Sequence, residues 1–188
     1  MKIASVLGVG AAGCPLSALM LPESALAADM VPLRLYSPHL QKGYNVELFV
    51  GSQWNENALL VCHYLMKDWR KNILVPCDRK LYAALYVIQR KFGIPDPINI
   101  FSGYRSAETN AMLRQQSIAR NGGRATAESP AVNSQHIQAK AVDFMLPGVP
   151  PLTVSKYVQT LGLGGTGNYP TFTHMDTRGE PARWGRGL

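Results

Sequence analysis

The chain has 188 residues, of which 46% are apolar and 16% are charged. This balance excludes a disordered tail, a collagen-like fibre and a polytopic membrane protein, and the length suits one domain with a single core. Nineteen Lys and Arg residues against 12 Asp and Glu residues give a net charge of +7, which suits an anionic partner: nucleic acid, a membrane surface or an acidic cell-wall polymer.

The first 27 residues have the pattern of a signal peptide. Lys2 provides a positive start, the run from Ile3 to Leu21 carries no charge, and Ala25-Leu26-Ala27 offers small residues to signal peptidase. We predict cleavage after Ala27, which leaves residues 28–188 as a single periplasmic domain. An uncleaved anchor is the alternative, but three glycines and a proline make this run a poor spanning helix. Export argues against nucleic acid as a partner and leaves no stable membrane span after cleavage.

Two cysteines remain after cleavage, and two interpretations of them stay open. An oxidising compartment favours a disulfide between Cys62 and Cys77 that closes a short loop. Alternatively both are buried thiols, because Cys62 aligns with Leu59, Met66 and Trp69 at helical spacing on an apolar face. Two lone sulfurs make no metal-ligand set of known spacing.

Short strands and helices alternate along the rest of the chain. Period-two alternation indicates the strands, while apolar residues three and four apart, preceded by Asn, Asp or Ser caps, indicate the helices. This interspersed order predicts an α+β domain with a small, mostly antiparallel sheet and helices packed on one face. The predicted elements are strands at 31–36 and 44–50 forming an N-terminal hairpin, a helix from Asn55 to about Trp69, a helix from Asp78 to Phe92, a strand at 98–101, a helix from Ser106 to about Arg114, a loop at 122–134, a strand at 141–146, a helix at 150–161, a turn at Gly164-Gly165 and a strand at 172–175.

Unusual polar residues concentrate at the ends of three predicted strands. They include two histidines and a carboxylate, His136, Asp143 and His174. Two neutral imidazoles and one oxygen anion form a three-ligand zinc set with a fourth position left for water, which is the composition of a catalytic site.

The spacing between the first two ligands constrains the chain. His136 and Asp143 are seven residues apart, so a continuous strand would send them to opposite faces, and a continuous helix would separate them by about 10 Å along its axis. The chain must therefore bend between them, and we predict the bend at residues 138–140.

The motifs that carry these residues resemble a known family. The pattern S-x-H-x-x-x-x-A-x-D, preceded by SGYRS and followed by T-H-x-D, is similar to zinc peptidases that cut peptidoglycan peptides. This group joins D-Ala-D-Ala carboxypeptidases, lysostaphin-type enzymes and the hedgehog signalling domain. Within it, the chain is most similar to the murein endopeptidase K-like proteins, which also carry an export signal, a segment like Leu65–Arg70 and P-G-V-P after the metal aspartate. The resemblance covers residues 31–184 and implies a hedgehog/D-Ala-D-Ala peptidase-like fold.

The resemblance also implies a role for each site residue. His136, Asp143 and His174 match the zinc ligands. Arg105 matches an arginine beside the metal, where a guanidinium can hold a substrate carboxylate or the oxyanion of the tetrahedral intermediate. Ser134 matches the serine before the first histidine and is expected to bind substrate by hydrogen bonding at the rim of the site.

The chain departs from the family pattern at two positions. The family usually has glycine where this chain has Ala139, so a bend that requires a positive φ would be strained. Many relatives carry Glu three residues before the last histidine, where this chain has Thr171. Asp176 shares a strand face with His174, so it can accept a proton from the attacking water as a catalytic base or orient the imidazole. Both roles stay open.

The expected function is that of a zinc-dependent periplasmic peptidoglycan hydrolase that cleaves D,D or L,D peptide cross-links. Its expected cofactor is Zn2+, its partners are peptidoglycan peptide stems, and it is expected to be a monomer. The alternative is a catalytically inactive, zinc-containing wall-binding domain on the same fold. His39 and His63 are assigned no role, and the C-terminal arginines are interpreted as a solvated basic tail.

Overall fold

The structure, a computed structural model, describes residues 31–188. The predicted signal peptide and its cleavage site lie outside the described residues. Within the described part, no helix has both the length and the apolar character needed to cross a bilayer.

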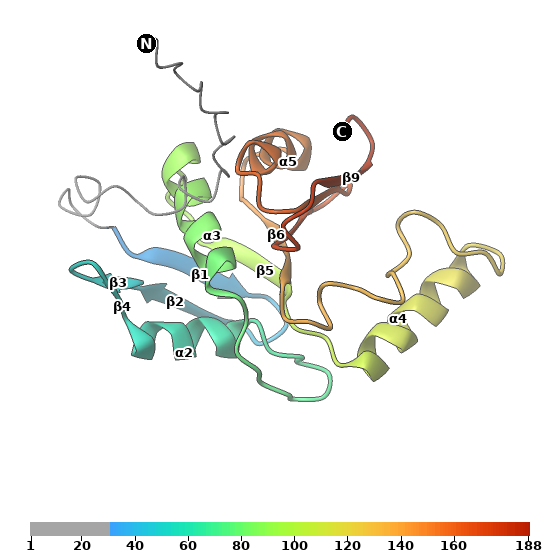
Figure 1. The fold of residues 1–188 in the computed structure, drawn as a ribbon, viewed down its shortest axis with the longest axis horizontal. Coiled ribbons are helices and arrows are strands. Elements are labelled where there is room, and N and C mark those ends of the chain that lie inside the picture. Colours follow the sequence, from blue (N-terminus) through green and yellow to red (C-terminus); the bar gives the residue numbers. More distant parts are fainter. Residues whose placement is uncertain (1–30) are drawn as a thin grey trace, which may run out of the picture.

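A sheet of seven strands forms the centre of the structure (Figure 1), in the order β2-β1-β5-β6-β8-β7-β9. Four neighbouring pairs are antiparallel, while the pairs β1–β5 and β7–β9 are parallel. The α+β class and the mostly antiparallel sheet are therefore confirmed, and β1 and β2 form the predicted N-terminal hairpin. The strands are β1 Leu33–Ser37, β2 Lys42–Val46, β5 Ile98–Ser102, β6 Ala141–Met145, β7 Gly165–Asn168, β8 Thr173–Asp176 and β9 Ala182–Gly185.

Four helices accompany the sheet in the described residues: α2 Glu56–Leu65, α3 Arg79–Phe92, α4 Ala107–Arg120 and α5 Pro151–Thr160. The predicted caps are present, because the side chains of Asn55, Asp78 and Ser106 each accept a hydrogen bond from a backbone N–H of the first turn. Helix α2 is shorter than predicted, and α4 continues beyond the expected end at Arg114.

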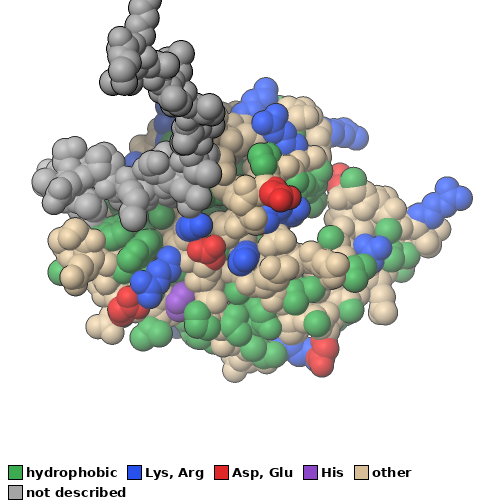
Figure 2. Space-filling model, viewed as in Figure 1, with side chains coloured by type: hydrophobic (Ala, Val, Ile, Leu, Met, Phe, Trp, Pro, Cys, Tyr) green, Lys and Arg blue, Asp and Glu red, His purple; other side chains and the backbone are tan. Residues whose placement is uncertain are grey.

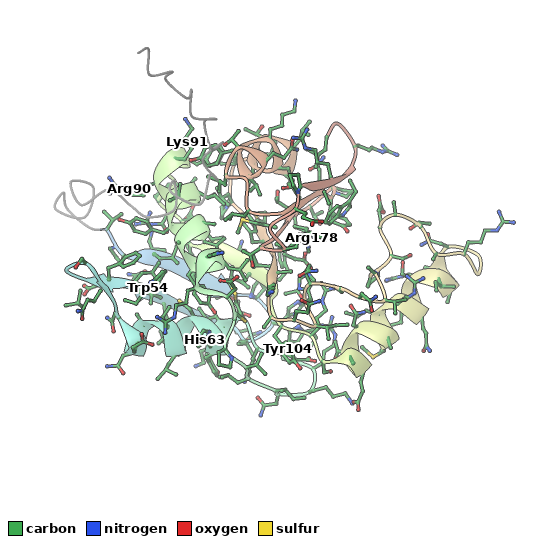
Figure 3. The ribbon with its side chains drawn as sticks, viewed as in Figure 1. Trp54, His63, Arg90, Lys91, Tyr104 and Arg178 are labelled. Atoms are coloured by element: carbon green, nitrogen blue, oxygen red, sulfur yellow. The ribbon has the colours of Figure 1, made fainter. Side chains whose placement is uncertain are left out.

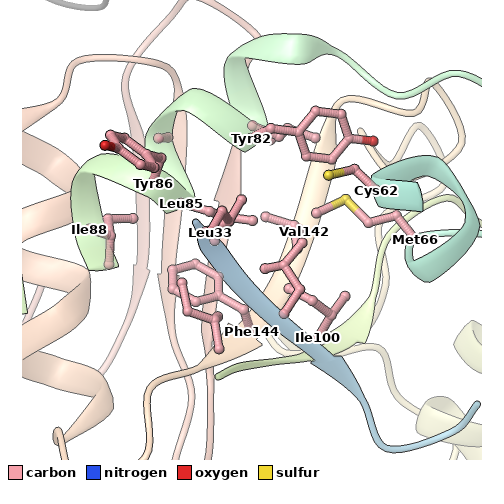
Figure 4. Close-up of a cluster of buried hydrophobic side chains, with 14 of the residues drawn as sticks. Leu33, Cys62, Met66, Tyr82, Leu85, Tyr86, Ile88, Ile100, Val142 and Phe144 are labelled. Atoms are coloured by element: carbon pink, nitrogen blue, oxygen red, sulfur yellow. The ribbon is translucent and has the colours of Figure 1, made fainter. Parts of the chain in front are cut away.

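The hydrophobic core lies between one face of the sheet and three of the helices. Leu33 of β1 and Val142 and Phe144 of β6 project toward Leu85 and Ile88 of α3 (Figure 4), and all five side chains are fully buried. Helices α2, α3 and α5 contact the strands, whereas α4 lies to the side of the sheet (Figure 1). Side chains alternate between the two faces along each strand. The residues between these core positions therefore point to the opposite face of the sheet.

Two short strands interrupt the chain where the second arm of the hairpin was predicted to continue. The strand predicted at 44–50 ends at Val46, and β3 Phe49–Val50 then pairs with β4 Gln53–Trp54. The ring centroids of Phe49 and Trp54 are 4.5 Å apart, and this aromatic cross-strand contact stabilises the second hairpin.

The predicted turn at Gly164-Gly165 is wrong, because Gly165 begins strand β7. Apart from Thr166, the sequence of β7 lacks the β-branched and aromatic residues that signal a strand. Its glycines are required by neighbours distant in sequence: a Cβ at Gly165 would lie 2.4 Å from Oδ2 of Asp176, and a Cβ at Gly167 would lie 2.4 Å from Nε1 of Trp184. Strand β9, which carries Trp184, was not predicted either.

The two cysteines are free thiols in the structure, and both are buried. The sequence left open a disulfide or two buried thiols, and the structure contains the buried thiols. Burial raises the pKa of Cys62 to about 12 and that of Cys77 to about 11, so both sulfurs are protonated and unreactive at neutral pH.

Candidate metal centre

Three acceptor atoms converge on the face of the sheet opposite helices α2, α3 and α5. Asp143 on β6 and His174 on β8 are directly paired in the antiparallel ladder, so their side chains share a face. His136 reaches the same point from the segment that precedes β6. The ligand atoms of all three residues lie within 4.8 Å of one another, and all three side chains are buried.

A tight bend brings His136 back over β6. Ala139 has a φ of 55°, in the left-handed region that favours glycine. The backbone N–H of Ala139 donates to the carbonyl of His136 at 3.2 Å, and that of Lys140 donates to the carbonyl of Gln135 at 3.0 Å. The chain therefore bends at residues 138–140, and it does so with the strained alanine that the sequence pattern suggested.

The tautomers of both histidines follow from their neighbours. Nδ1 of His136 lies 2.6 Å from the carbonyl oxygen of Gly103 and must donate to it, which leaves a lone pair on Nε2. Nε2 of His174 lies 3.2 Å from Oδ2 of Asp176 and donates to this carboxylate, which leaves a lone pair on Nδ1. Both free lone pairs face Asp143.

The three acceptors need a cation between them. Nε2 of His136 lies 3.2 Å from Oδ1 of Asp143 and 3.3 Å from Nδ1 of His174, and the distance from Nδ1 of His174 to Oδ1 of Asp143 is 2.8 Å. In the tautomers above, no hydrogen lies between these atoms, so their lone pairs repel one another. A divalent ion with nitrogen and oxygen ligands satisfies all three, and the donor set is one that zinc prefers.

Electrostatics favour the metal-binding protonation states of His136 and Asp143, and they favour positive charge at His174. Burial and the positive charge of Arg105 lower the pKa of His136 to about 4. Burial opposes ionisation of Asp143, but His136 and Arg105 outweigh it and hold its pKa well below the usual range. For His174, burial is outweighed by hydrogen bonds to Asp143 and Asp176, which raise its pKa. The centre therefore attracts positive charge.

Asp176 lies on the side of His174 that faces away from the other two ligands. It is fully buried, and Oδ1 accepts a hydrogen bond from the backbone of Gly165 at 2.8 Å. The guanidinium of Arg178 binds both carboxylate oxygens, with Nε 2.9 Å from Oδ1 and Nη2 2.6 Å from Oδ2. Burial opposes ionisation of Asp176, but hydrogen bonds from His174 and Arg178 keep its pKa far below the usual range.

Arg178 was missed by the sequence interpretation, which placed it in a solvated tail. Figure 3 shows it beside the C-terminal strands, on the side that faces α4. Its spacing of two residues from Asp176 was an available signal, because a guanidinium so close along the chain can pair with the carboxylate.

The other two predicted site residues also lie at the cluster. Nη2 of Arg105 makes a short hydrogen bond to Oδ2 of Asp143, and its Nε donates to Oγ of Ser102 at 2.7 Å. Oγ of Ser134 accepts a hydrogen bond from the backbone N–H of His136 at 3.3 Å. The structure thus brings together all six residues that the sequence singled out.

A cavity of about 580 Å³ opens over this cluster. Helix α4 and the loop of residues 127–136 line it on one side, and Tyr169 and Trp184 line it on another. His39 also lines the cavity, although the sequence assigned it no role, and its ring stacks on Trp69 with centroids 4.2 Å apart. The volume of the cavity suits a small ligand or a short peptide.

Comparison with known proteins identifies the family. Residues 25–184 match the family model described as Peptidoglycan L,D-endopeptidase MepK. The chain belongs to this family. Membership of the MepK family confirms the resemblance to murein endopeptidase K-like proteins, and it confirms the expectation of a metallopeptidase that acts on murein.

Two curated members of the MepK family illustrate the similarity. The probable peptidoglycan L,D-endopeptidase MepK of Haemophilus influenzae is 34% identical over 183 residues, which cover 94% of this chain and 92% of the relative. The peptidoglycan L,D-endopeptidase MepK of Escherichia coli K12 is 31% identical over 177 residues, which cover 91% of each chain. No solved structure matches the chain at a significant level.

Proposed function

We propose that this protein is a zinc-dependent, periplasmic L,D-endopeptidase that cleaves peptide cross-links of peptidoglycan. The observation that carries the proposal is the convergence of three unprotonated acceptor atoms, on His136, Asp143 and His174, at the base of a cavity. The names of the MepK relatives favour the L,D bond over the D,D bond. The proposal includes residues 1–27 as a signal peptide, a monomeric mature domain and the D-Ala-D-Ala peptidase-like fold.

In this proposal the three acceptor residues hold the zinc ion. When bound, Zn2+ supplies a Lewis acid that lowers the pKa of water and polarises the scissile carbonyl. The two imidazoles bind through the nitrogens that Gly103 and Asp176 leave unprotonated. Asp143 contributes one oxygen, because its other oxygen is engaged by Arg105.

Arg105 and Ser134 are proposed to act on the substrate. The Arg105 guanidinium is fixed by Asp143 and Ser102 and lines the cavity, so it is positioned to stabilise negative charge that develops on the carbonyl oxygen. The hydroxyl of Ser134 accepts from the backbone of His136, and its own hydrogen is free to bind a substrate carbonyl at the rim.

We propose that Asp176 is a positioning residue and that it is not the base. Its carboxylate is fully buried and bound by Arg178, and it contacts the nitrogen of His174 that points away from the other ligands. A base must reach the water that it deprotonates, whereas a carboxylate in this position orients a metal-binding imidazole and increases its basicity.

The global charge contributes to capture of an anionic polymer in a general way. On the face seen in Figure 2, Lys and Arg side chains project from several elements and do not gather into one patch. The net charge of +7 attracts an acidic wall by long-range electrostatics, while specific recognition is left to the residues of the cavity.

Digestion of defined cross-linked muropeptides tests the proposal. The purified protein is expected to hold one zinc ion and to cleave the L,D cross-link, and both properties are lost on chelation and restored by added zinc. His136→Ala is expected to abolish cleavage while circular dichroism reports the native fold. Stoichiometric zinc binding with no new cleavage products would favour the inactive wall-binding alternative. Cleavage of D,D cross-links alone would contradict the proposed bond.

A further inference from the structure

We propose that Arg70 forms a second, carboxylate-binding site in the cavity, which holds a free carboxylate of the peptide substrate while the metal centre holds the scissile bond. The inference rests on the proposed function and deepens it, because it names the chemical group that this wall of the cavity recognises.

Arg70 is held against aromatic side chains at the cavity wall. Its guanidinium carbon lies 4.1 Å from the ring centroid of Trp69. Trp69 in turn stacks on the imidazole of His39, with ring planes 17° apart. Both Arg70 and His39 line the cavity that contains the metal centre. Stacking restricts the guanidinium before any ligand binds, which lowers the entropic cost of binding.

The backbone of Arg70 is tied to the segment that carries Arg105. Asp68 is buried, and its Oδ1 accepts hydrogen bonds from the backbone N–H groups of Arg70 at 3.1 Å and Lys71 at 3.3 Å. Its Oδ2 accepts from the backbone N–H of Ser106 at 2.9 Å. One buried carboxylate therefore fixes the position of Arg70 relative to Arg105, the immediate neighbour of Ser106.

Arg70 differs from Arg105 and Arg178 in having no ion pair among residues 31–188. Arg105 is paired with Asp143, and Arg178 is paired with Asp176. Partial burial and the positive charge of Arg105 lower the pKa of Arg70, while the negative charge of Asp68 opposes this shift, and the side chain is exposed. An anionic ligand in the cavity can therefore reach this guanidinium and pair with it.

The geometry of a guanidinium selects the class of ligand. Its planar N–H groups match the two oxygens of a carboxylate, and charge-assisted pairs of this kind are stronger than neutral hydrogen bonds. Peptidoglycan stems carry free carboxylates on D-amino acids and on diaminopimelate. Either group has the required chemistry, and selective amidation distinguishes them.

Three cross-linked muropeptides provide the test: one with all carboxylates free, one amidated at diaminopimelate and one amidated at the D-amino acid carboxylate. We expect one amidation to lower kcat/KM of the wild-type protein by about 10- to 100-fold, the range of a charge-assisted hydrogen bond. Arg70→Gln is expected to lose a similar factor on the free peptide, mainly through KM, and to cleave the free and amidated forms equally. Arg70→Lys is expected to retain part of the preference.

Arg183→Gln is the matched control. Arg183 is exposed on β9 between two residues that line the cavity, but it does not line the cavity itself. The control removes the same charge nearby and is expected to keep the wild-type preference. If Arg70→Gln discriminates as strongly as the wild type, the inference is overturned and the proposed function stands.

A binding measurement keeps the inference testable if the proposed function fails. Should the wild-type protein cleave none of the peptides, calorimetry of the zinc-loaded protein with the intact peptides decides. Tighter binding of the free peptide by the wild type, lost in Arg70→Gln, would support the carboxylate site. Equal binding of free and amidated peptides by the wild type would overturn it.

Discussion

His174 and Asp176 are two residues apart on β8, and their side chains meet on one face of the strand, with Nε2 of the imidazole 3.2 Å from Oδ2 of the carboxylate. The contact occupies the ring nitrogen that points away from Asp143, so it directs the lone pair of Nδ1 toward the other ligands. In the proposed function, the carboxylate would therefore act on the metal centre through the imidazole.

Asp176→Asn tests this relationship. Removal of the charge weakens the hold on the imidazole, so we expect zinc affinity to fall by about 10- to 100-fold. Cleavage at saturating zinc is expected to fall by much less. Chelator competition gives the affinity, and muropeptide digestion gives the rate. If Asp176 is instead the base, kcat will fall by about 10²- to 10⁴-fold with unchanged zinc affinity.

Ala139→Gly should stabilise the protein. Ala139 has a φ of 55°, which costs an alanine about 1–2 kcal/mol relative to glycine. The greater freedom of glycine in the unfolded chain offsets part of this gain, so a net rise of about 0.5–1 kcal/mol in the free energy of unfolding is expected. Thermal unfolding measures it as a rise of a few degrees in Tm. The control Ala141→Gly, in strand β6, should lower Tm.

Gly103→Ala should damage both stability and metal binding. An added Cβ would lie 2.4 Å from Cβ of Met66 and 2.5 Å from its carbonyl oxygen, so the backbone must move. The carbonyl of Gly103 orients His136, and its displacement disturbs that ligand. We expect a loss of about 1–3 kcal/mol in unfolding free energy and about a tenfold loss in zinc affinity.

Gly148→Ala is the control for that substitution. Gly148 has a φ of +75°, and nothing lies within 4 Å of an added Cβ. The alanine there adds backbone strain without steric overlap, so stability should fall slightly while zinc affinity is unchanged. Equal losses of zinc affinity in the two variants would contradict the steric argument.

The buried cysteines predict a loss of stability at alkaline pH. Their pKa values are raised from 9.0 to about 12 for Cys62 and about 11 for Cys77. Above pH 9 the unfolded chain loses thiol protons that the folded chain keeps, so the free energy of unfolding falls as pH rises toward these values. Denaturant titration from pH 8 to pH 11 measures the slope, which Cys62→Ala should reduce.

Thiol labelling checks the same burial independently. At pH 8 a thiol reagent should modify neither cysteine in the native protein and both after denaturation. Rapid labelling of the native protein would contradict the burial. Absence of labelling after denaturation without reductant would indicate a disulfide.

Local signals in the sequence predicted much of the fold. The caps at Asn55, Asp78 and Ser106 were found because capping depends on residues two or three positions apart. The apolar face of α3 followed from helical spacing. The C-terminal region was predicted less well. Strand β7 has glycine at two of its four positions, and glycine does not signal a strand. Those glycines make room for Asp176 and Trp184, which lie distant in sequence.

The sequence by itself determined the class of the domain, the three candidate ligands and the need for a bend between His136 and Asp143, because each depends on residue type and short-range spacing. Only the tertiary structure decided which nitrogen of each histidine is free, that Arg178 pairs with Asp176, and that Arg70 faces the same cavity as Arg105. These features depend on pairing between distant strands and on burial, which set hydrogen-bond partners and charge energies that no local pattern encodes.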